Sequence, residues 1–173
     1  MTSRDFMNAV ANGKTDVVQA LLDVLEDLGV EYCVIGGLAV NTYVEPVVSL
    51  DLDVVVAATH VDKVCAAMGK HFGVRRGAHS VDLTSSASDL RIQLQTDPRY
   101  QGFLGKATAR EVLGYELRVA AVEDVLQGKV WAYSDTQRRR SKRQKDLADI
   151  LRFTEAYPAL ETALPASVRD KLT

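Results

Sequence analysis

Cysteine is scarce in this sequence, with only Cys33 and Cys65 among 173 residues. Two thiols are too few for a disulfide framework or a zinc ribbon, and Cys33 stands in an apolar strand pattern where a buried thiol is common. No apolar run approaches the roughly 18 residues of a membrane span, and residues 1–14 lack the apolar centre of a secretory signal. We therefore expect reduced cysteines, no membrane segment and a cytoplasmic location.

The chain also lacks a large overall charge, because 21 basic and 23 acidic residues leave a net charge of −2. The hydrophobic content of 47% and charged content of 25% are those of an ordinary globular domain and exclude disordered, collagen-like and coiled-coil chains. The charges are unevenly placed, with 9 acidic and 2 basic residues in 1–56 but 9 basic and 5 acidic residues in 138–173. This asymmetry suits a site that gathers metal ions and phosphates, or two solvated faces.

Hydrophobic periodicity predicts a mixed α/β fold that becomes helical towards the end of the chain. Strands are predicted at residues 31–35, 50–56, 74–76, 88–95 and 116–120, with a further candidate at 81–84. Helices are predicted at 15–28, 38–44, 60–71, 122–133 and 137–157, followed by a weakly helical tail at 158–173. We expect an α/β core over residues 1–120 and a C-terminal helical segment, 121–173, that completes the same domain.

The most informative segment is 34–56, in which one strand ends at Gly36-Gly37 and the next begins with Asp51 and Asp53. Residues two apart on a strand share a face, so the two carboxylates project together. Mg²⁺ typically takes one or two protein carboxylates plus substrate phosphates, and glycines let backbone N–H groups approach a phosphate. The segment predicts Mg²⁺ at the aspartates and phosphate at the glycines, although each element alone also suits a plain turn or a solvated strand end.

These residues resemble the signature of the polymerase-β-like nucleotidyltransferase superfamily, in Ile35-Gly36-Gly37 and Asp51-Leu52-Asp53-Val54. The resemblance implies a nucleotidyltransferase-type mixed β-sheet flanked by helices, which holds an NTP and Mg²⁺. Most members supply a third carboxylate from a later strand. In the corresponding strand, 88–95, the polar face instead carries Arg91, Gln93 and Gln95, and glutamine cannot act as a base. Gln93 is therefore kept as a supporting residue, and the sequence also admits a catalytically inactive protein.

Two later segments, 123–129 and 143–150, resemble the lysine and Asp-x-x-Asp motifs of AbiEii-type nucleotidyltransferases. That subgroup includes toxins of bacterial toxin–antitoxin systems, so the resemblance implies a toxin-type enzyme with an antitoxin protein as partner. It also implies catalytic roles for Lys129 and Asp146.

The position of Lys129 supports a site role independently, because it lies inside an apolar stripe of the helix predicted at 122–133. A lysine there is costly without an anion, unless its stem carries the charge out to water. The functional interpretation is that Lys129 holds the triphosphate or offsets charge that develops during transfer. On this pattern alone, Lys129→Met is predicted to raise stability, because it removes the cost of desolvating an ammonium group.

Asp146 and Asp149 are three residues apart and face the same side of the last predicted helix. Asp149 is either a supporting site residue or a partner in a salt bridge with Arg143, Lys145 or Arg152. Six of the eight residues from Arg138 to Lys145 are basic, which suits either the phosphates of an RNA acceptor or a solvated helix start. Arg143 and Lys145 are therefore also kept as supporting candidates.

Together these patterns predict an Mg²⁺-dependent nucleotidyltransferase that transfers a nucleoside monophosphate from an NTP to an acceptor. The acceptor classes that the sequence admits are RNA or tRNA, protein and a small molecule. The predicted catalytic residues are Asp51, Asp53, Lys129 and Asp146, with Gly36, Gly37 and Lys129 on the nucleotide. The alternative is a catalytically inactive module on the same fold that recognises a protein or RNA partner.

Overall fold

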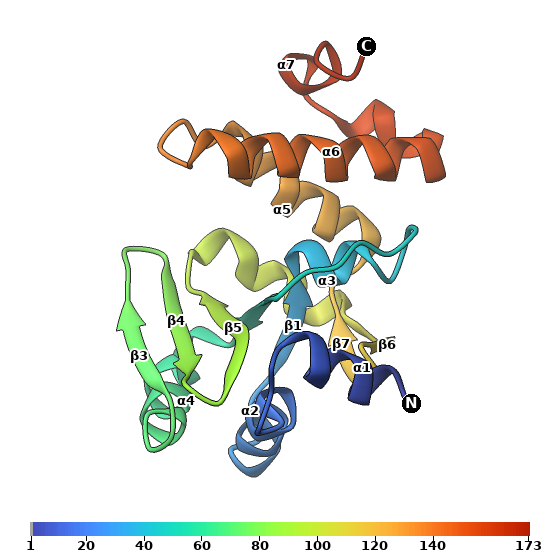
Figure 1. The fold of residues 1–173 in the computed structure, drawn as a ribbon. Helices are drawn as coiled ribbons and strands as arrows, with labels where there is room; N and C mark the ends of the chain where they lie inside the picture. The colour runs from blue at the N-terminus through green and yellow to red at the C-terminus, as the bar shows by residue number, and fades with distance from the viewer. Residues whose placement is uncertain (1) are drawn as a thin grey trace.

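The computed structural model describes residues 2–173, which form one seven-stranded sheet and its surrounding helices (Figure 1). The strands are β1 Tyr32–Ile35, β2 Asp51–Val56, β3 Gly73–Arg76, β4 Ser80–Ser85, β5 Ser88–Gln95, β6 Thr108–Val112 and β7 Tyr115–Val119. Their order across the sheet is β3-β4-β5-β2-β1-β7-β6. β2 runs parallel to β5 and β1 parallel to β7, whereas the other neighbours are antiparallel. The mixed sheet flanked by helices confirms the predicted fold class.

The α-helices are α1 Ser3–Val10, α2 Val17–Asp27, α3 Gly36–Val40, α4 Val61–Met68, α5 Val122–Ser134, α6 Arg140–Ala156 and α7 Ala166–Arg169. Short 3₁₀ helices lie at Ala58–His60, Pro98–Lys106 and Pro158–Ala163. α2 begins where the Asp16 carboxylate accepts a hydrogen bond of 3.0 Å from the Gln19 N–H. Its buried side chains are Val17, Val18, Leu21 and Leu25. α5 and α6 lie together at one end of the sheet, with α3 packed between them and the strands (Figure 1).

Four elements have no counterpart in the sequence-based prediction: α1, the 3₁₀ helices at 58–60 and 98–106, and β6. β6 is an edge strand in which only Val112 is buried, so its sequence lacks the alternation that marks a half-buried strand. α1 is similarly exposed along most of its described length. The further strand candidate at 81–84 is confirmed as part of β4.

Cys33 and Cys65 are free, buried thiols, and burial raises the pKa of Cys33 to about 12. The raised pKa keeps the Cys33 thiol protonated and therefore unreactive, because the thiolate is the reactive form. Within residues 2–173, no helix combines the length and apolar character that crossing a membrane requires. The division of the domain at residue 120 stays a prediction.

Candidate active site

The turn between β1 and α3 presses the backbone against a carboxylate. Gly36 has a φ of +71°, in the left-handed region that side chains other than glycine rarely adopt. Its neighbour Ile35 is the cross-strand partner of Asp53, and a Cβ on Gly36 would overlap Asp53 Oδ2. Gly37 lacks this constraint, because a Cβ there would meet Ser49 at ordinary contact distances of 3.6–3.8 Å. The steric requirement for glycine therefore falls on Gly36.

Asp51 and Asp53 project from one face of β2, while Leu52 and Val54 are buried on the other. Burial raises the pKa of Asp53 and the Asp51 charge adds to this effect, whereas the Lys129 charge opposes it. Among residues 2–173, Asp53 has no hydrogen-bond or ion-pair partner. The Asp53 carboxylate therefore lies beside the glycine turn with its oxygens available.

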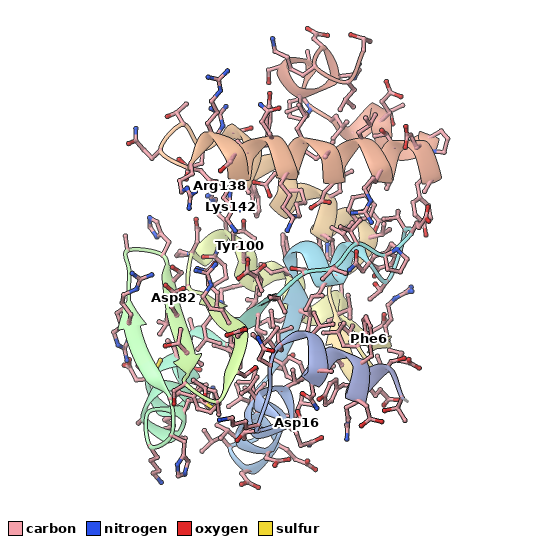
Figure 2. All side chains as sticks on the ribbon, viewed as in Figure 1. Phe6, Asp16, Asp82, Tyr100, Arg138 and Lys142 are labelled. Atoms are coloured by element: carbon pink, nitrogen blue, oxygen red, sulfur yellow. The ribbon has the colours of Figure 1, made fainter. Side chains whose placement is uncertain are left out.

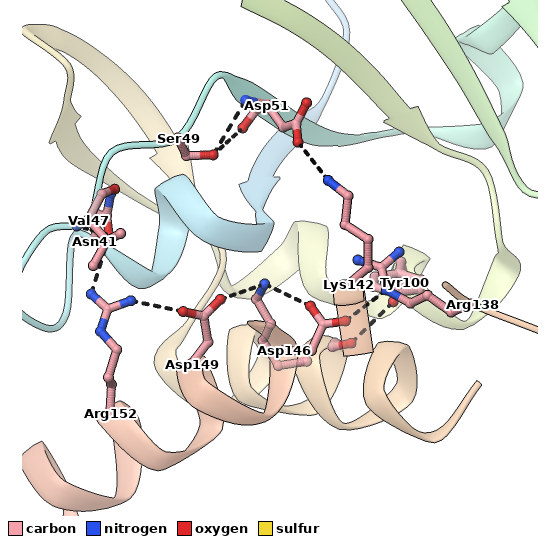
Figure 3. A network of polar contacts seen from close by, with 12 residues as sticks. Asn41, Val47, Ser49, Asp51, Tyr100, Arg138, Lys142, Asp146, Asp149 and Arg152 are labelled. Atoms are coloured by element: carbon pink, nitrogen blue, oxygen red, sulfur yellow. Dashed lines mark hydrogen bonds and ion pairs between the residues drawn. The ribbon is translucent and has the colours of Figure 1, made fainter. Parts of the chain in front are cut away.

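Asp51 differs from Asp53 in being paired with two cations. Arg91 Nη2 on β5 lies 2.9 Å from Asp51 Oδ1, and Lys142 Nζ on α6 lies 3.4 Å from Asp51 Oδ2. Figure 3 shows Lys142 reaching from α6 to this carboxylate. The lysine thus links the C-terminal helices to the strand that carries the paired aspartates.

Lys129 on α5 is the centre of a buried charge network. Its Nζ lies 3.1 Å from Asp146 Oδ1 and 2.8 Å from Asp149 Oδ2, and the three side chains are only 8%, 2% and 6% exposed, respectively. The inward position predicted for Lys129 is confirmed. Burial lowers the pKa of Lys129, but the charges of Asp149 and Asp146 raise it more, so the net shift is upward.

This network corrects one prediction. From the sequence pattern alone, replacing Lys129 by methionine is predicted to raise stability, because it removes an ammonium group from an apolar stripe. The structure gives Lys129 two buried aspartate partners, which Lys129→Met would leave facing each other. The change is therefore expected to lower stability, because removing one member of a buried ion pair leaves an uncompensated charge.

Two arginines extend the network at either end. Arg138 Nε donates to Asp146 Oδ2 at 2.7 Å, and Arg152 Nη1 donates to Asp149 Oδ1 at 2.8 Å (Figure 3). The charges therefore alternate in sign along the network, in the order Arg138, Asp146, Lys129, Asp149 and Arg152. The salt bridge considered for Asp149 exists with Arg152, in addition to its pair with Lys129.

The basic segment from Arg138 to Lys145 divides into two groups. Half-buried members are engaged with the protein: Arg138 with Asp146, Lys142 with Asp51, and Arg143 with the Tyr133 carbonyl through a bond of 2.7 Å. The other basic side chains, which are exposed, are Arg139, Arg140 and Lys145. Any acceptor bound by this segment would therefore meet the exposed group.

Several predicted site residues come together around one small pocket of about 80 Å³. Its wall includes the following predicted residues: Gly36, Asp53, Gln93, Lys129 and Asp146. Gly37, Lys145 and Asp149 line a second, smaller hollow. Asp51 lines neither hollow, and Arg143 is bound to the Tyr133 carbonyl. The structure thus brings together the five predicted residues of the first pocket, and their catalytic roles stay predictions.

Tyr100 and Gln95 also line this pocket but have no place in the sequence-based site. Tyr100 lies in the 3₁₀ helix at 98–106, and burial raises its pKa to about 12, so its hydroxyl stays protonated. Figure 2 shows Tyr100 close to Arg138 and Lys142. The Asp-Pro at the start of this 3₁₀ helix is a local turn signal, but nothing in the sequence indicates that the turn leads to the site.

A larger hollow, of about 560 Å³, lies elsewhere, between α1, the loop at 41–49 and the β6–β7 turn. None of the residues that line it is a predicted site residue. Size alone therefore does not locate the chemistry, and the smaller pocket is the better candidate because buried ionisable groups converge there.

The candidate metal position contains only two carboxylates. In the part of the chain that the structure describes, no three His, Cys, Asp or Glu side chains group as a metal cluster. The position beside Asp53 on the neighbouring strand is occupied by Gln93, its cross-strand partner on β5. The neighbouring strand therefore supplies an amide at this position and not a third carboxylate, as the sequence predicts.

No protein-family model matches the chain, and no curated protein matches it in sequence. Solved structures do resemble its fold. The antibiotic-resistance factor ANT(2'')-Ia has a TM-score of 0.56 at 13% identity, covering 90% of this chain and 86% of that chain. The lincosamide antibiotic adenylyltransferase LnuA, bound to lincomycin, has a TM-score of 0.54 at 12% identity, covering 80% and 97% of the two chains. The chain has the nucleotidyltransferase fold.

A nucleotidyltransferase-like antigenic protein from Paracoccidioides brasiliensis extends the comparison, with a TM-score of 0.56 at 18% identity over 98% of this chain and 90% of that chain. At these identities the likeness establishes the nucleotidyltransferase fold, and function must be argued from the site. The AbiEii-type subgroup suggested by residues 123–129 and 143–150 stays a prediction.

Proposed function

We propose that the protein is an Mg²⁺-dependent nucleotidyltransferase that transfers a nucleoside monophosphate from an NTP to an acceptor and releases pyrophosphate. The observation that carries this proposal is the fit between Gly36 and Asp53, with Lys129 in the same pocket wall. The stability of the fold does not require a close-packed glycine turn, an available carboxylate and a buried cation to lie in one place. The same arrangement suits a triphosphate and its metal ion.

The donor chemistry at the aspartates fits Mg²⁺. Asp51 and Asp53 offer carboxylate oxygens from one strand face, and Mg²⁺ commonly completes its shell with water and substrate phosphates. When bound, the ion would neutralise the phosphates and polarise the reacting phosphorus. The Arg91 and Lys142 charges beside Asp51 are equally suited to the phosphates that accompany the ion.

In the proposed reaction, an acceptor hydroxyl oxygen bonds to the α-phosphorus while the bond from that phosphorus to the β-bridging oxygen breaks. Pyrophosphate leaves with the electron pair of that bond, and the hydroxyl proton passes to water. Gly36 and Gly37 contribute backbone near the phosphates, and Lys129 offsets charge on the leaving group. Asp146 positions Lys129 through its 3.1 Å ion pair. Catalysis then rests on positioning and charge stabilisation.

The acceptor follows from weaker features. The exposed basic side chains of α6 and its start favour RNA, whereas ANT(2'')-Ia is described with adenylyl-2''-tobramycin and LnuA with lincomycin, which favours a small molecule. The AbiEii-like motifs add the proposal of a toxin-type enzyme with an antitoxin partner. We favour RNA, because the exposed basic group lies on this chain itself.

A transfer assay tests the proposal. Pure protein is incubated with Mg²⁺, each of the four NTPs labelled at the α-phosphate, and total RNA, protein or small-molecule acceptors. We expect label in one acceptor with release of pyrophosphate, and loss of both in Asp53→Asn. Absence of transfer to every acceptor class, with no Mg²⁺-dependent NTP binding, would reject the proposal.

The second candidate function is a catalytically inactive module of the same fold that binds a protein or RNA partner. Gln93 favours it, because an amide stands beside Asp53 where a third carboxylate would serve as base. Salt-sensitive RNA binding without transfer from any NTP would support this second candidate.

A further inference from the structure

A row of cross-strand partners leads from the edge of the sheet to the pocket. Arg75 on β3 pairs in register with Asp82 on β4, Asp82 with Gln93 on β5, and Gln93 with Asp53 on β2. Directly paired residues on neighbouring strands place their side chains on the same face. One polar row therefore runs from an exposed edge strand to the candidate metal position.

The side chains of this row are in contact. Arg75 forms an ion pair with Asp82, and Gln93 Nε2 donates to Asp82 Oδ1 at 2.8 Å. Figure 2 labels Asp82 on the β-hairpin side of the pocket region. Asp82 is only 8% exposed. Burial acts to raise the pKa of Asp82, but the hydrogen bonds from Arg75 and Gln93 outweigh burial and leave that pKa lowered.

The hydrogen bond to Asp82 defines the orientation of the Gln93 amide, because Nε2 is the atom that donates to Asp82 Oδ1. The amide oxygen Oε1 is consequently directed away from Asp82. Gln93 lines the pocket together with Asp53, and no donor within residues 2–173 is bonded to its Oε1. The row thus leaves one neutral oxygen acceptor unengaged beside the Asp53 carboxylate.

The same row explains why this position carries an amide. A glutamate at position 93 would lie between the carboxylates of Asp82 and Asp53 and add a third negative charge in one row. Arg75 would offset this repulsion only weakly, because its side chain is 80% exposed and its charge is screened by water. Glutamine keeps an oxygen at the site without this repulsion.

We propose that Gln93 Oε1 is the third protein oxygen for the Mg²⁺ ion of this site, and that Asp82 is the positioning residue that orients the amide. The inference rests on the proposed function, because it assumes that Asp51 and Asp53 hold the ion. Amide carbonyl oxygens are suitable ligands for hard divalent cations. A partner that orients a metal ligand typically changes metal affinity by roughly 10- to 100-fold when it is removed.

Metal affinity tests the proposal without reliance on turnover. Free Mn²⁺, as a spectroscopic substitute for Mg²⁺, is measured by electron spin resonance in the presence of the α,β-methylene analogue of each NTP. Gln93→Leu and Asp82→Asn should each weaken Mn²⁺ binding by about 10-fold or more. Thr84→Val, an exposed substitution on the same strand as Asp82, is the matched control and should leave the affinity unchanged.

The double variant separates positioning from a purely structural role. If Asp82 acts through Gln93, Asp82→Asn should have no further effect on Mn²⁺ affinity in the Gln93→Leu background. Unchanged affinity in both single variants would overturn the role of Gln93 and leave the proposed function intact. If the wild-type protein binds no Mn²⁺ with any analogue, both proposals fall. Should Asp82→Asn fail to fold, Gln93→Leu alone decides.

Discussion

Replacing Lys129 by methionine probes the charge network at the centre of the site. Methionine has a similar length and no charge, so the change removes the cation and retains most of the packing. The side chains of Asp146 and Asp149, 2% and 6% exposed, would remain buried three residues apart on α6. Each would keep one arginine, Arg138 or Arg152, at 2.7 and 2.8 Å, respectively.

The expected cost follows from these partners. Breaking a buried ion pair by removing one member costs roughly 3–5 kcal/mol, and the remaining arginines place this case at the lower end, about 3 kcal/mol. For a chain of this size, 1 kcal/mol corresponds to about 2–4 °C, so Tm should fall by about 6–12 °C. Lys142→Met is the matched control, because Lys142 is 38% exposed and lies 3.4 Å from its partner. It should change stability by less than about 1 kcal/mol.

Thermal melts and urea denaturation of both variants measure these changes, and the sign of the result is decisive. A Lys129→Met protein that melts at or above the wild-type temperature would refute the network argument. It would restore the interpretation of Lys129 as an unpaired cation in an apolar stripe. If Lys129→Met and Lys142→Met lose the same amount of stability, burial does not strengthen the ion pairs of Lys129, which would likewise refute the network argument.

The stability contributed by Lys129 should also depend on pH. Burial lowers its pKa, but Asp149 and Asp146 raise it more, so the folded pKa lies above the ordinary value of 10.5. A group with a raised folded pKa contributes fully below the unfolded pKa and loses its contribution as pH rises through the folded pKa. The stability difference between wild type and Lys129→Met should therefore be constant up to about pH 10 and narrow above it. Urea midpoints across this range measure the effect, and an unchanged difference at higher pH would contradict it.

Two further predictions concern the glycine turn and the basic segment. Gly36→Ala should destabilise the protein by more than Gly29→Ala, because both have positive φ but only the alanine at 36 would meet the Asp53 carboxylate. The Gly29→Ala change should cost about 1–2 kcal/mol, and equal losses in urea denaturation would contradict the contact. Charge reversal of the exposed basic residues Arg139, Arg140 and Lys145 should weaken RNA binding and make it depend less on salt concentration. NTP binding should be unchanged. If RNA binding by the wild-type protein in filter assays does not depend on salt concentration, this basic surface is not the RNA-binding site.

Local sequence patterns were sufficient to predict β1, β2 and α5, which carry Asp53 and Lys129, but not the 3₁₀ helix that carries Tyr100. The strand, glycine turn and Asp-x-Asp pattern of residues 34–56 reflects backbone periodicity, which acts over a few residues. The inward position of Lys129 also follows from helical spacing within one segment. The partners of Lys129 follow from how α5 packs on α6, so their pairing depends on tertiary contacts.

The row through Asp82 and Gln93 could not be predicted from the sequence for a different reason. Which β4 residue faces Gln93 depends on the register of β4 against β5, which includes an irregularity between Leu83 and Ser85. A shift of one residue would place Asp82 on the opposite face of the sheet. Similarly, the edge strand β6 carries little hydrophobic signal because four of its five residues are exposed.

Calorimetric titration of Mg²⁺ and the α,β-methylene analogue of each NTP into wild type, Asp51→Asn and Asp53→Asn tests the central claim most directly. The account predicts Mg²⁺-dependent binding of at least one analogue by the wild-type protein and its loss in both variants. Asp53→Asn should not be severely destabilised, because it reduces repulsion between the two carboxylates. Asp51→Asn weakens two partly exposed ion pairs, to Arg91 and Lys142, and pairs of this kind contribute little to stability. Analogue binding that is the same in all three proteins, or that does not require Mg²⁺, would contradict the assignment of this pocket as a metal–nucleotide site.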